Sequence, residues 1–191
     1  MLINSSTNLF QTTAVLPVLP RKLNFYGLRM NDFIRDGFEF VCNINNSKSN
    51  EDKWYYENIV QSIMYCNHRS WVYFIVVDGY IFKIGETSQP LGVRKSGFQI
   101  QPNTGSKSRL GRYIDGDGTD EAIRESSVPY ITDGYRIEIW AKKCEISKAK
   151  TLIFGEETEI QQSTQKDQEM AYINKFEDSV GIRPIWNKYR K

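Results

Sequence analysis

The chain has 191 residues, a formal net charge of +2, 40% hydrophobic residues and 25% charged residues. This length suits one domain with an elaboration, and this composition is typical of a globular protein rather than a disordered or collagen-like one. No stretch approaches the roughly 18 consecutive apolar residues of a membrane-spanning helix, and no basic segment precedes an apolar run at the N-terminus. We therefore expect neither a membrane span nor a signal peptide.

The cysteines indicate the compartment rather than a site. Cys42, Cys66 and Cys144 are widely spaced and odd in number. This pattern fits neither a disulfide framework nor a zinc site, and it favours a reducing, cytoplasmic location. The small net charge does not by itself predict nucleic-acid binding, so an argument for such a partner must rest on where the charges lie.

Residues 1–66 are predicted to form an N-terminal elaboration. Residues 1–20 are polar with prolines and predict a poorly ordered arm. Short apolar runs broken by glycine and aspartate over 21–45 predict a hairpin or small satellite elements. The polar segment 45–52 predicts a loop and a boundary, and apolar residues recurring every three to four positions predict a helix over 54–66.

The strongest local signal is a β-hairpin over Trp71–Ile84. Two runs of β-branched and aromatic residues flank the dipeptide Asp78-Gly79. Asp-Gly is favoured in type I′ turns because both central residues of such a turn need positive φ.

The later elements are assigned by the same reasoning. They are expected in this order: a short helix around Leu91–Phe98, a glycine-containing loop over 101–118, a helix beginning at Thr119, a strand over 135–144, and mostly helix over 147–180 with a break near Gly155. The third strand joins the hairpin, so the predicted fold is α+β, with a small three-stranded antiparallel sheet flanked by helices.

Basic side chains gather after the hairpin. Between residues 83 and 112, six basic residues accompany the single acid Glu86: Lys83, Arg94, Lys95, Lys107, Arg109 and Arg112. Such an excess favours a phosphate-facing surface, although a solvated loop face is the alternative. The candidate DNA-binding residues are Lys95, Lys107, Arg109 and Arg112.

A series of short motifs runs from the hairpin to the C-terminus: Val72-Tyr73-Phe74, Lys83-Ile84-Gly85-Glu86-Thr87, Arg94, Glu169 and Pro184-Ile185-Trp186-Asn187. In this order and spacing they resemble the GIY-YIG nuclease family, over roughly residues 70–190. The resemblance implies a nuclease domain over 67–191. Residues 1–66 lie outside it and are expected to serve specificity or dimerisation.

The resemblance also implies roles for individual residues. Tyr73 would lie near the scissile phosphate and help to activate the attacking water, and Gly85 would keep a side chain out of the floor of the site. Arg94 would stabilise charge on the phosphate, because its planar guanidinium can grip two oxygens. Glu169 would be the carboxylate that holds Mg²⁺ or Mn²⁺, and Asn187 would brace the site from the C-terminal segment.

Two positions depart from the family pattern. Lys83 stands where the second motif usually has tyrosine, and Val72 stands where the first usually has glycine. A lysine near a phosphate can lower the pKa of an adjacent phenol or water, so Lys83 is counted among the candidate catalytic residues. Valine is a better strand former than glycine, so the second departure is minor.

Glu169 is chosen for its position on a predicted helix. It shares one face with Tyr172, Ile173 and Phe176, and a carboxylate that ends an apolar stripe is better suited to bind a buried ligand than to face solvent. An ordinary surface glutamate is the alternative interpretation. Other glutamates compete for the same role: Glu156, Glu157, Glu159 and Glu177.

The resemblance implies a metal-dependent endonuclease that hydrolyses phosphodiester bonds in double-stranded DNA, of the sequence-specific restriction type or a phage nuclease. Two alternatives remain: a structure-specific repair or recombination nuclease, and an inactive nucleic-acid-binding protein in which Lys83 marks the loss of catalysis. A protein with one site needs two protomers or two nicks to cut both strands, so a homodimer is expected. A cognate DNA methyltransferase is a further candidate partner.

Overall fold

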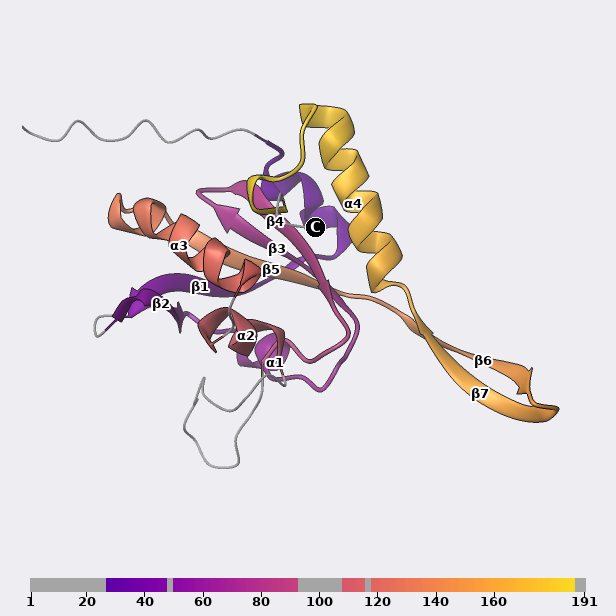
Figure 1. The fold of residues 1–191 in the computed structure, drawn as a ribbon. Coiled ribbons are helices and arrows are strands. Elements are labelled where there is room, and N and C mark those ends of the chain that lie inside the picture. The colour runs from indigo at the N-terminus through magenta and orange to yellow at the C-terminus, as the bar shows by residue number, and fades with distance from the viewer. Residues whose placement is uncertain (1–26, 48–49, 93–107, 116–117, 188–191) are drawn as a thin grey trace, which may run out of the picture.

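The structure is a computed structural model that describes residues 27–47, 50–92, 108–115 and 118–187. Its centre is a five-stranded antiparallel sheet with the strand order β2-β1-β5-β3-β4, and a separate two-stranded ribbon projects from it (Figure 1). The strands of the sheet are β1 Glu39–Ser47, β2 Asn50–Glu57, β3 Trp71–Val77, β4 Tyr80–Thr87 and β5 Ile137–Lys143. None of the helices within these described ranges is long and apolar enough to cross a membrane.

The predicted hairpin is present as β3 and β4. Asp78 and Gly79 form its turn with φ values of 48° and 86°, as the Asp-Gly signal requires. All seven side chains of β3 are buried, because the sheet is covered on both faces. The third predicted strand is also present, as β5.

The sheet has five strands, so the prediction of three was wrong. The additional strands come from the N-terminal region, where β1 pairs with β5 and places Ile44 opposite Ile137. The helix predicted over 54–66 is replaced by β2 and the short helix α1 Gln61–Met64. Pairing with β1 makes this segment a strand rather than a helix. It buries Trp54 and leaves the adjacent Tyr55 exposed, which is the alternation of a strand.

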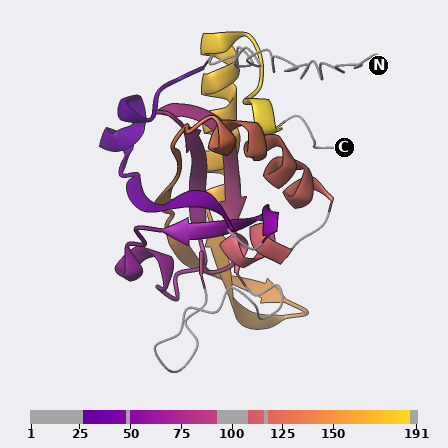
Figure 2. The same cartoon turned by 90° about the vertical axis from the view of Figure 1, so that its left-hand side faces the viewer.

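Helices cover the two faces of the sheet. One face packs against α1, α2 Arg109–Asp115, α3 Thr119–Thr132 and the 3₁₀ turn η2 Ile185–Asn187. The opposite face packs against the 3₁₀ helix η1 Met30–Asp36 and α4 Gln165–Val180. Figure 2, at right angles to the first view, shows α3 and η1 on opposite sides of the strands. The central strands therefore lie between two layers of helix.

The C-terminal half departs most from prediction. Residues expected to be helical from 147 form the ribbon instead, with strands β6 Ile146–Ile153 and β7 Glu156–Ser163, and helix α4 follows it. Phe154 and Gly155 both have positive φ and close the hairpin turn, which a helix could not accommodate. The break expected near Gly155 is thus a turn between two strands.

Two other predicted segments are only partly described. The helix expected around Leu91–Phe98 lies mostly outside the described residues. The loop predicted over 101–118 is described only over 108–115 and at 118. The described part contains α2, so the prediction was wrong there. The helix that begins at Thr119 is present and continues to Thr132.

Candidate active site

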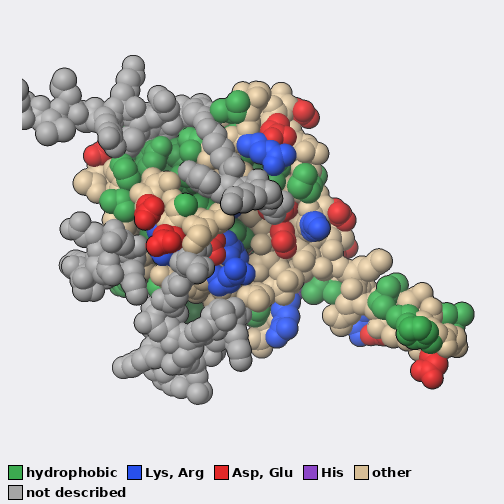
Figure 3. Space-filling view, in the orientation of Figure 1, with side chains coloured by type: hydrophobic (Ala, Val, Ile, Leu, Met, Phe, Trp, Pro, Cys, Tyr) green, Lys and Arg blue, Asp and Glu red, His purple; other side chains and the backbone are tan. Residues whose placement is uncertain are grey.

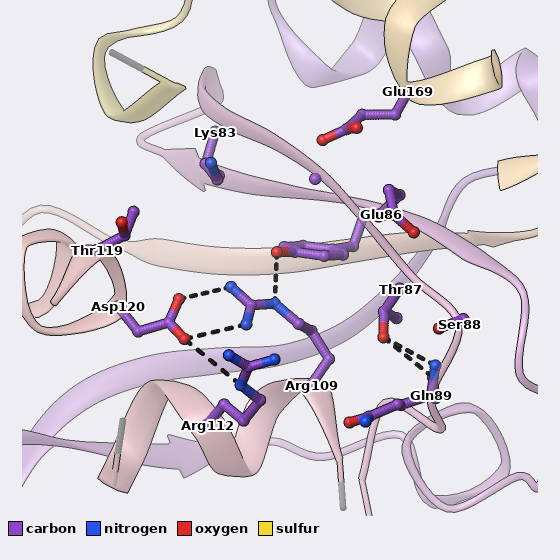
Figure 4. Close-up of a pocket in the computed structure, with 12 residues that line it drawn as sticks. Lys83, Glu86, Thr87, Ser88, Gln89, Arg109, Arg112, Thr119, Asp120 and Glu169 are labelled. Carbon is purple, nitrogen blue, oxygen red and sulfur yellow. Dashed lines mark hydrogen bonds and ion pairs between the residues drawn. The ribbon is translucent and has the colours of Figure 1, made fainter. Parts of the chain in front are cut away.

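A polar cleft of about 390 Å³ lies along β4, one of the two edge strands of the five-stranded sheet (Figure 4). Strands β3 and β4 and helices α2, α3 and α4 all contribute to it. Its lining residues are Tyr73, Lys83, Gly85, Glu86, Thr87, Ser88, Gln89, Arg109, Arg112, Thr119, Asp120 and Glu169. Six of the residues predicted from the sequence are therefore gathered in one place: Tyr73, Lys83, Gly85, Arg109, Arg112 and Glu169.

Tyr73 and Gly85 form a cross-strand pair at the floor of the cleft. They lie directly opposite each other in the β3–β4 register. A Cβ atom built on Gly85 would lie 2.4 Å from both Cζ and Oη of Tyr73, which is far inside van der Waals contact. The phenol therefore lies over the glycine, and any side chain at position 85 would have to displace it.

The phenol oxygen of Tyr73 is held by two neighbours from α2. Nε of Arg109 donates a hydrogen bond to it at 2.7 Å, and the hydroxyl of Tyr113 lies 2.9 Å from it. The guanidinium carbon of Arg109 also sits 4.2 Å from the centroid of the Tyr113 ring. One turn of helix thus supplies a cation and a second phenol to the same oxygen.

The surroundings fix the protonation states of Tyr113 and Arg109. Burial raises the pKa of Tyr113 well above its usual value, with a smaller contribution from Tyr73, so Tyr113 stays a neutral phenol. For Arg109, burial lowers the pKa, but Tyr73, Tyr113 and Asp120 together outweigh it and raise the pKa above its usual value. Arg109 is therefore a permanent cation beside the Tyr73 oxygen.

Asp120, in the first turn of α3, holds the guanidinium from the other side. Its two carboxylate oxygens accept hydrogen bonds from the terminal nitrogens of Arg109 at 2.6 and 3.1 Å. The same carboxylate lies 3.9 Å from Nε of Arg112, whose side chain is 52% exposed compared with 14% for Arg109. Of the two predicted DNA-binding arginines in α2, one is thus engaged inside the protein and the other faces solvent.

Glu169 lies in α4 and is 1% exposed. Ile173 and Phe176, on the helical face predicted from the sequence, are buried with it. Figure 4 shows the side chains of Glu169 and Lys83 directed into the same part of the cleft. The competing glutamates do not line it: Glu156, Glu157 and Glu159 lie on the exposed β7, and Glu177 pairs with Arg183.

The donor atoms of the cleft suit a hard divalent cation. Within the described ranges no group of three or more histidine, cysteine or acidic side chains is arranged so that it could hold a metal ion. Mg²⁺ does not require one, because it is usually bound through one or two carboxylates and completes its shell with water and phosphate. Glu169 is a buried carboxylate, and Glu86, Thr87 and Ser88 add further oxygen atoms to the same lining.

Asn187 contacts the site through the backbone of β4. Its Oδ1 accepts a hydrogen bond from the Ile84 N–H, and its Nδ2 donates one to the Ile84 carbonyl, both at 2.8 Å. These bonds occupy the open edge of the strand between Lys83 and Gly85. A buried amide thus takes the place of a further strand at this point.

Three members of the site were not predicted from the sequence: Tyr113, Asp120 and Glu86. Tyr113 lies four residues after Arg109 and so shares its helical face, a spacing that could have indicated it. The other three predicted residues, Arg94, Lys95 and Lys107, lie outside the described residues.

No protein-family model and no curated protein matches this chain. Among solved structures, a mutant of EndoII from bacteriophage T4 is similar, with a TM-score of 0.53 and 14% identity over 84% of this chain and 98% of that chain. The restriction endonuclease HPY188I in complex with product DNA aligns with a TM-score of 0.46 and 18% identity, over 86% of this chain and 88% of that chain. The likeness to EndoII shows a shared fold.

Proposed function

We propose that this chain is a metal-dependent endonuclease of the GIY-YIG type that hydrolyses phosphodiester bonds in double-stranded DNA. The observation that carries the proposal is the cleft itself, where a phenol held by a permanent cation shares a pocket with Lys83 and the buried carboxylate of Glu169. The fold that the chain shares with a phage endonuclease, EndoII, supports the same function.

Hydrolysis requires water to attack phosphorus while the bond to the 3′-oxygen breaks and the water loses a proton. Tyr73 is the group proposed to help take that proton. A phenol can take that proton only after it has lost its own, so Tyr73 is proposed to act as the phenolate, with its own proton released to solvent beforehand. The guanidinium of Arg109 donates directly to this oxygen and so stabilises the anion. The departing 3′-oxygen takes a proton from solvent. Lys83 adds a second cation to the lining of the same cleft.

Glu169 is the proposed ligand of Mg²⁺ or Mn²⁺, with Glu86 as a second oxygen donor in the same lining. A bound cation supplies charge neutralisation at the phosphoryl oxygen and the leaving oxygen. Asn187 is proposed to act through β4, because it fixes the backbone between Lys83 and Gly85.

Phosphate contacts complete the proposal. Arg112 is exposed at the rim of the cleft and is proposed to contact the DNA backbone, as are Lys95 and Lys107. Arg94 is proposed to grip the scissile phosphate itself, because a guanidinium can bind two phosphate oxygens at once.

We further propose that cutting is sequence-specific, as in a restriction or phage enzyme. In this proposal residues 1–66 serve specificity or dimerisation, a second protomer cuts the second strand, and a cognate methyltransferase protects host DNA. The region 1–66 also supplies β1 and β2 to the sheet that carries β3 and β4. A structure-specific repair or recombination nuclease is the second candidate.

The test is cleavage of supercoiled plasmid and linear phage DNA by the purified protein, with and without Mg²⁺. Discrete fragments that disappear with a chelator, and that are absent for Tyr73→Phe and Glu169→Gln, are expected. A smear with no consensus at the mapped ends would favour the structure-specific nuclease. A clear mobility shift without cutting in Mg²⁺ or Mn²⁺ would overturn the enzyme proposal in favour of a DNA-binding protein.

A further inference from the structure

The ribbon β6–β7 is the least covered part of the described molecule. It projects from the domain, and its strands pair only with each other among the described strands (Figure 1). Every described side chain in the two strands is exposed or half-exposed. An isolated two-stranded hairpin is marginally stable in water and usually needs further strands or a packed face. We therefore expect the ribbon to pack against a partner.

One face of the ribbon is charged and internally paired. Residues directly opposite each other in the register share a face, so Lys148 and Lys150 of β6 lie on the same face as Glu157 and Glu159 of β7. The Lys148 ammonium lies 2.8 Å from the Glu159 carboxylate, and Lys150 forms the second ion pair with Glu157. This face satisfies its own charges, and its two apolar residues, Ile146 and Leu152, lie at opposite ends of β6 with the lysines between them.

The opposite face carries a single charge, which lies at its tip. It consists of small, β-branched and neutral polar residues, with Glu156 beside the turn: Ser147, Ala149, Thr151, Ile153, Glu156, Thr158, Ile160 and Gln162. We call this surface the neutral face. It has few long side chains, so another sheet can pack against it at the usual distance of about 10 Å.

The tip of the ribbon adds exposed apolar area. Phe154, in the turn, is fully exposed, and Ile153, at the tip end of the neutral face, is 42% exposed. Figure 3 shows hydrophobic side chains gathered at the end of the projection. Contiguous apolar surface at an exposed position is typical of an interaction site.

We propose that the neutral face is a homodimer interface that packs against the same face of a second copy of this chain. The partner must offer a flat surface almost without charge, and this chain itself presents such a surface. Two copies related by a two-fold axis would bury the same residues of each copy, because an isologous interface uses the same patch twice. Two stacked ribbons give a four-stranded, two-layer structure, which supplies the packing that one ribbon lacks.

The charges of the ribbon argue against a nucleic acid as its partner. Residues 146–163 contain two lysines and three glutamates, a net charge of 2 − 3 = −1. Glu156 and Glu157 stand next to the apolar tip, where an insertion between bases would bring them close to phosphates. The same charges disfavour an anionic membrane surface.

Sedimentation of the full-length protein, without DNA or added metal, tests the proposal independently of any nuclease activity. The wild type is expected to be a dimer at micromolar concentration. Ile160→Lys places a charge on the neutral face and should yield monomer, whereas Gln161→Lys, the next residue on the charged face, should remain dimeric. A second matched pair lies at the tip. Ile153→Lys, on the neutral face, should likewise yield monomer, and Leu152→Lys, on the charged face, should remain dimeric.

A crosslinking measurement covers the case in which a lysine variant unfolds the ribbon. In a Cys66→Ser background, Thr158→Cys on the neutral face should crosslink between protomers with a short bismaleimide, and Gln161→Cys on the charged face should not. A monomeric wild type, or equal behaviour within each matched pair, would overturn the proposal. Loss of DNA binding or of vesicle binding by Phe154→Ala in a monomeric protein would assign the tip to that partner instead.

Discussion

Arg109 donates from Nε to the phenol oxygen of Tyr73 at 2.7 Å, and this contact connects helix α2 to the interior strand β3. The same guanidinium uses its terminal nitrogens to bind both oxygens of Asp120. Its three donor nitrogens are thus divided between one phenol and one carboxylate. A lysine could not reproduce this arrangement, because an ammonium is a point charge without the planar fork.

Replacing Arg109 tests whether this contact supports catalysis. Arg109→Lys should slow single-turnover cleavage by about 10²–10³-fold, the scale of losing one preorganised group that stabilises charge. Arg112→Lys is the matched control, since its exposed side chain should change the rate only a few-fold. Circular dichroism should show both variants folded. A similar small effect of both substitutions would remove Arg109 from the mechanism.

Asp120 should matter for stability as well as for activity. Asp120→Asn leaves the buried Arg109 charge without its carboxylate, and breaking such a pair costs about 3–5 kcal/mol. Lys148→Gln breaks an exposed ion pair on the ribbon and should cost less than about 1 kcal/mol. Urea denaturation measures both changes in the free energy of unfolding. Equal small costs would show that the Arg109–Asp120 pair is not needed for the fold.

The close approach of Gly85 to Tyr73 makes a steric prediction. Gly85→Ala should destabilise the protein by about 1–3 kcal/mol and lower activity, because the new Cβ would displace the phenol ring. In a Tyr73→Ala background the same change should cost much less, since the atoms in its way are gone. A double-mutant cycle on the free energy of unfolding measures the difference. Additive costs would contradict a direct clash between the two residues.

Glu169 should be separable from DNA binding. Glu169→Gln removes the charge but keeps the shape of the side chain, so it should abolish Mg²⁺-dependent cleavage and weaken Mn²⁺ binding in calorimetry. Binding of DNA in Ca²⁺ should change little. Glu177→Gln, on the same helix but paired with Arg183, should cleave like the wild type. Unchanged cleavage by Glu169→Gln would transfer the metal role to another oxygen donor such as Glu86.

The sequence by itself determined the features that depend on neighbouring residues. Asp78-Gly79 specifies the β3–β4 hairpin because only a few residue types accept the backbone angles of its turn. The spacing of Glu169, Ile173 and Phe176 specifies which side of α4 is buried. Both signals lie within a few positions along the chain.

Only the tertiary structure decided how distant segments meet. A strand, β2, replaced part of a predicted helix because β1, which itself pairs with β5, offers its other edge as a hydrogen-bond ladder for β2. The polar stretch from 146 to 163 has no apolar face to indicate its conformation, and its turn and cross-strand ion pairs made it a ribbon. Asp120 reached Arg109 because α2 and α3 pack together, and local sequence patterns do not encode such contacts between elements.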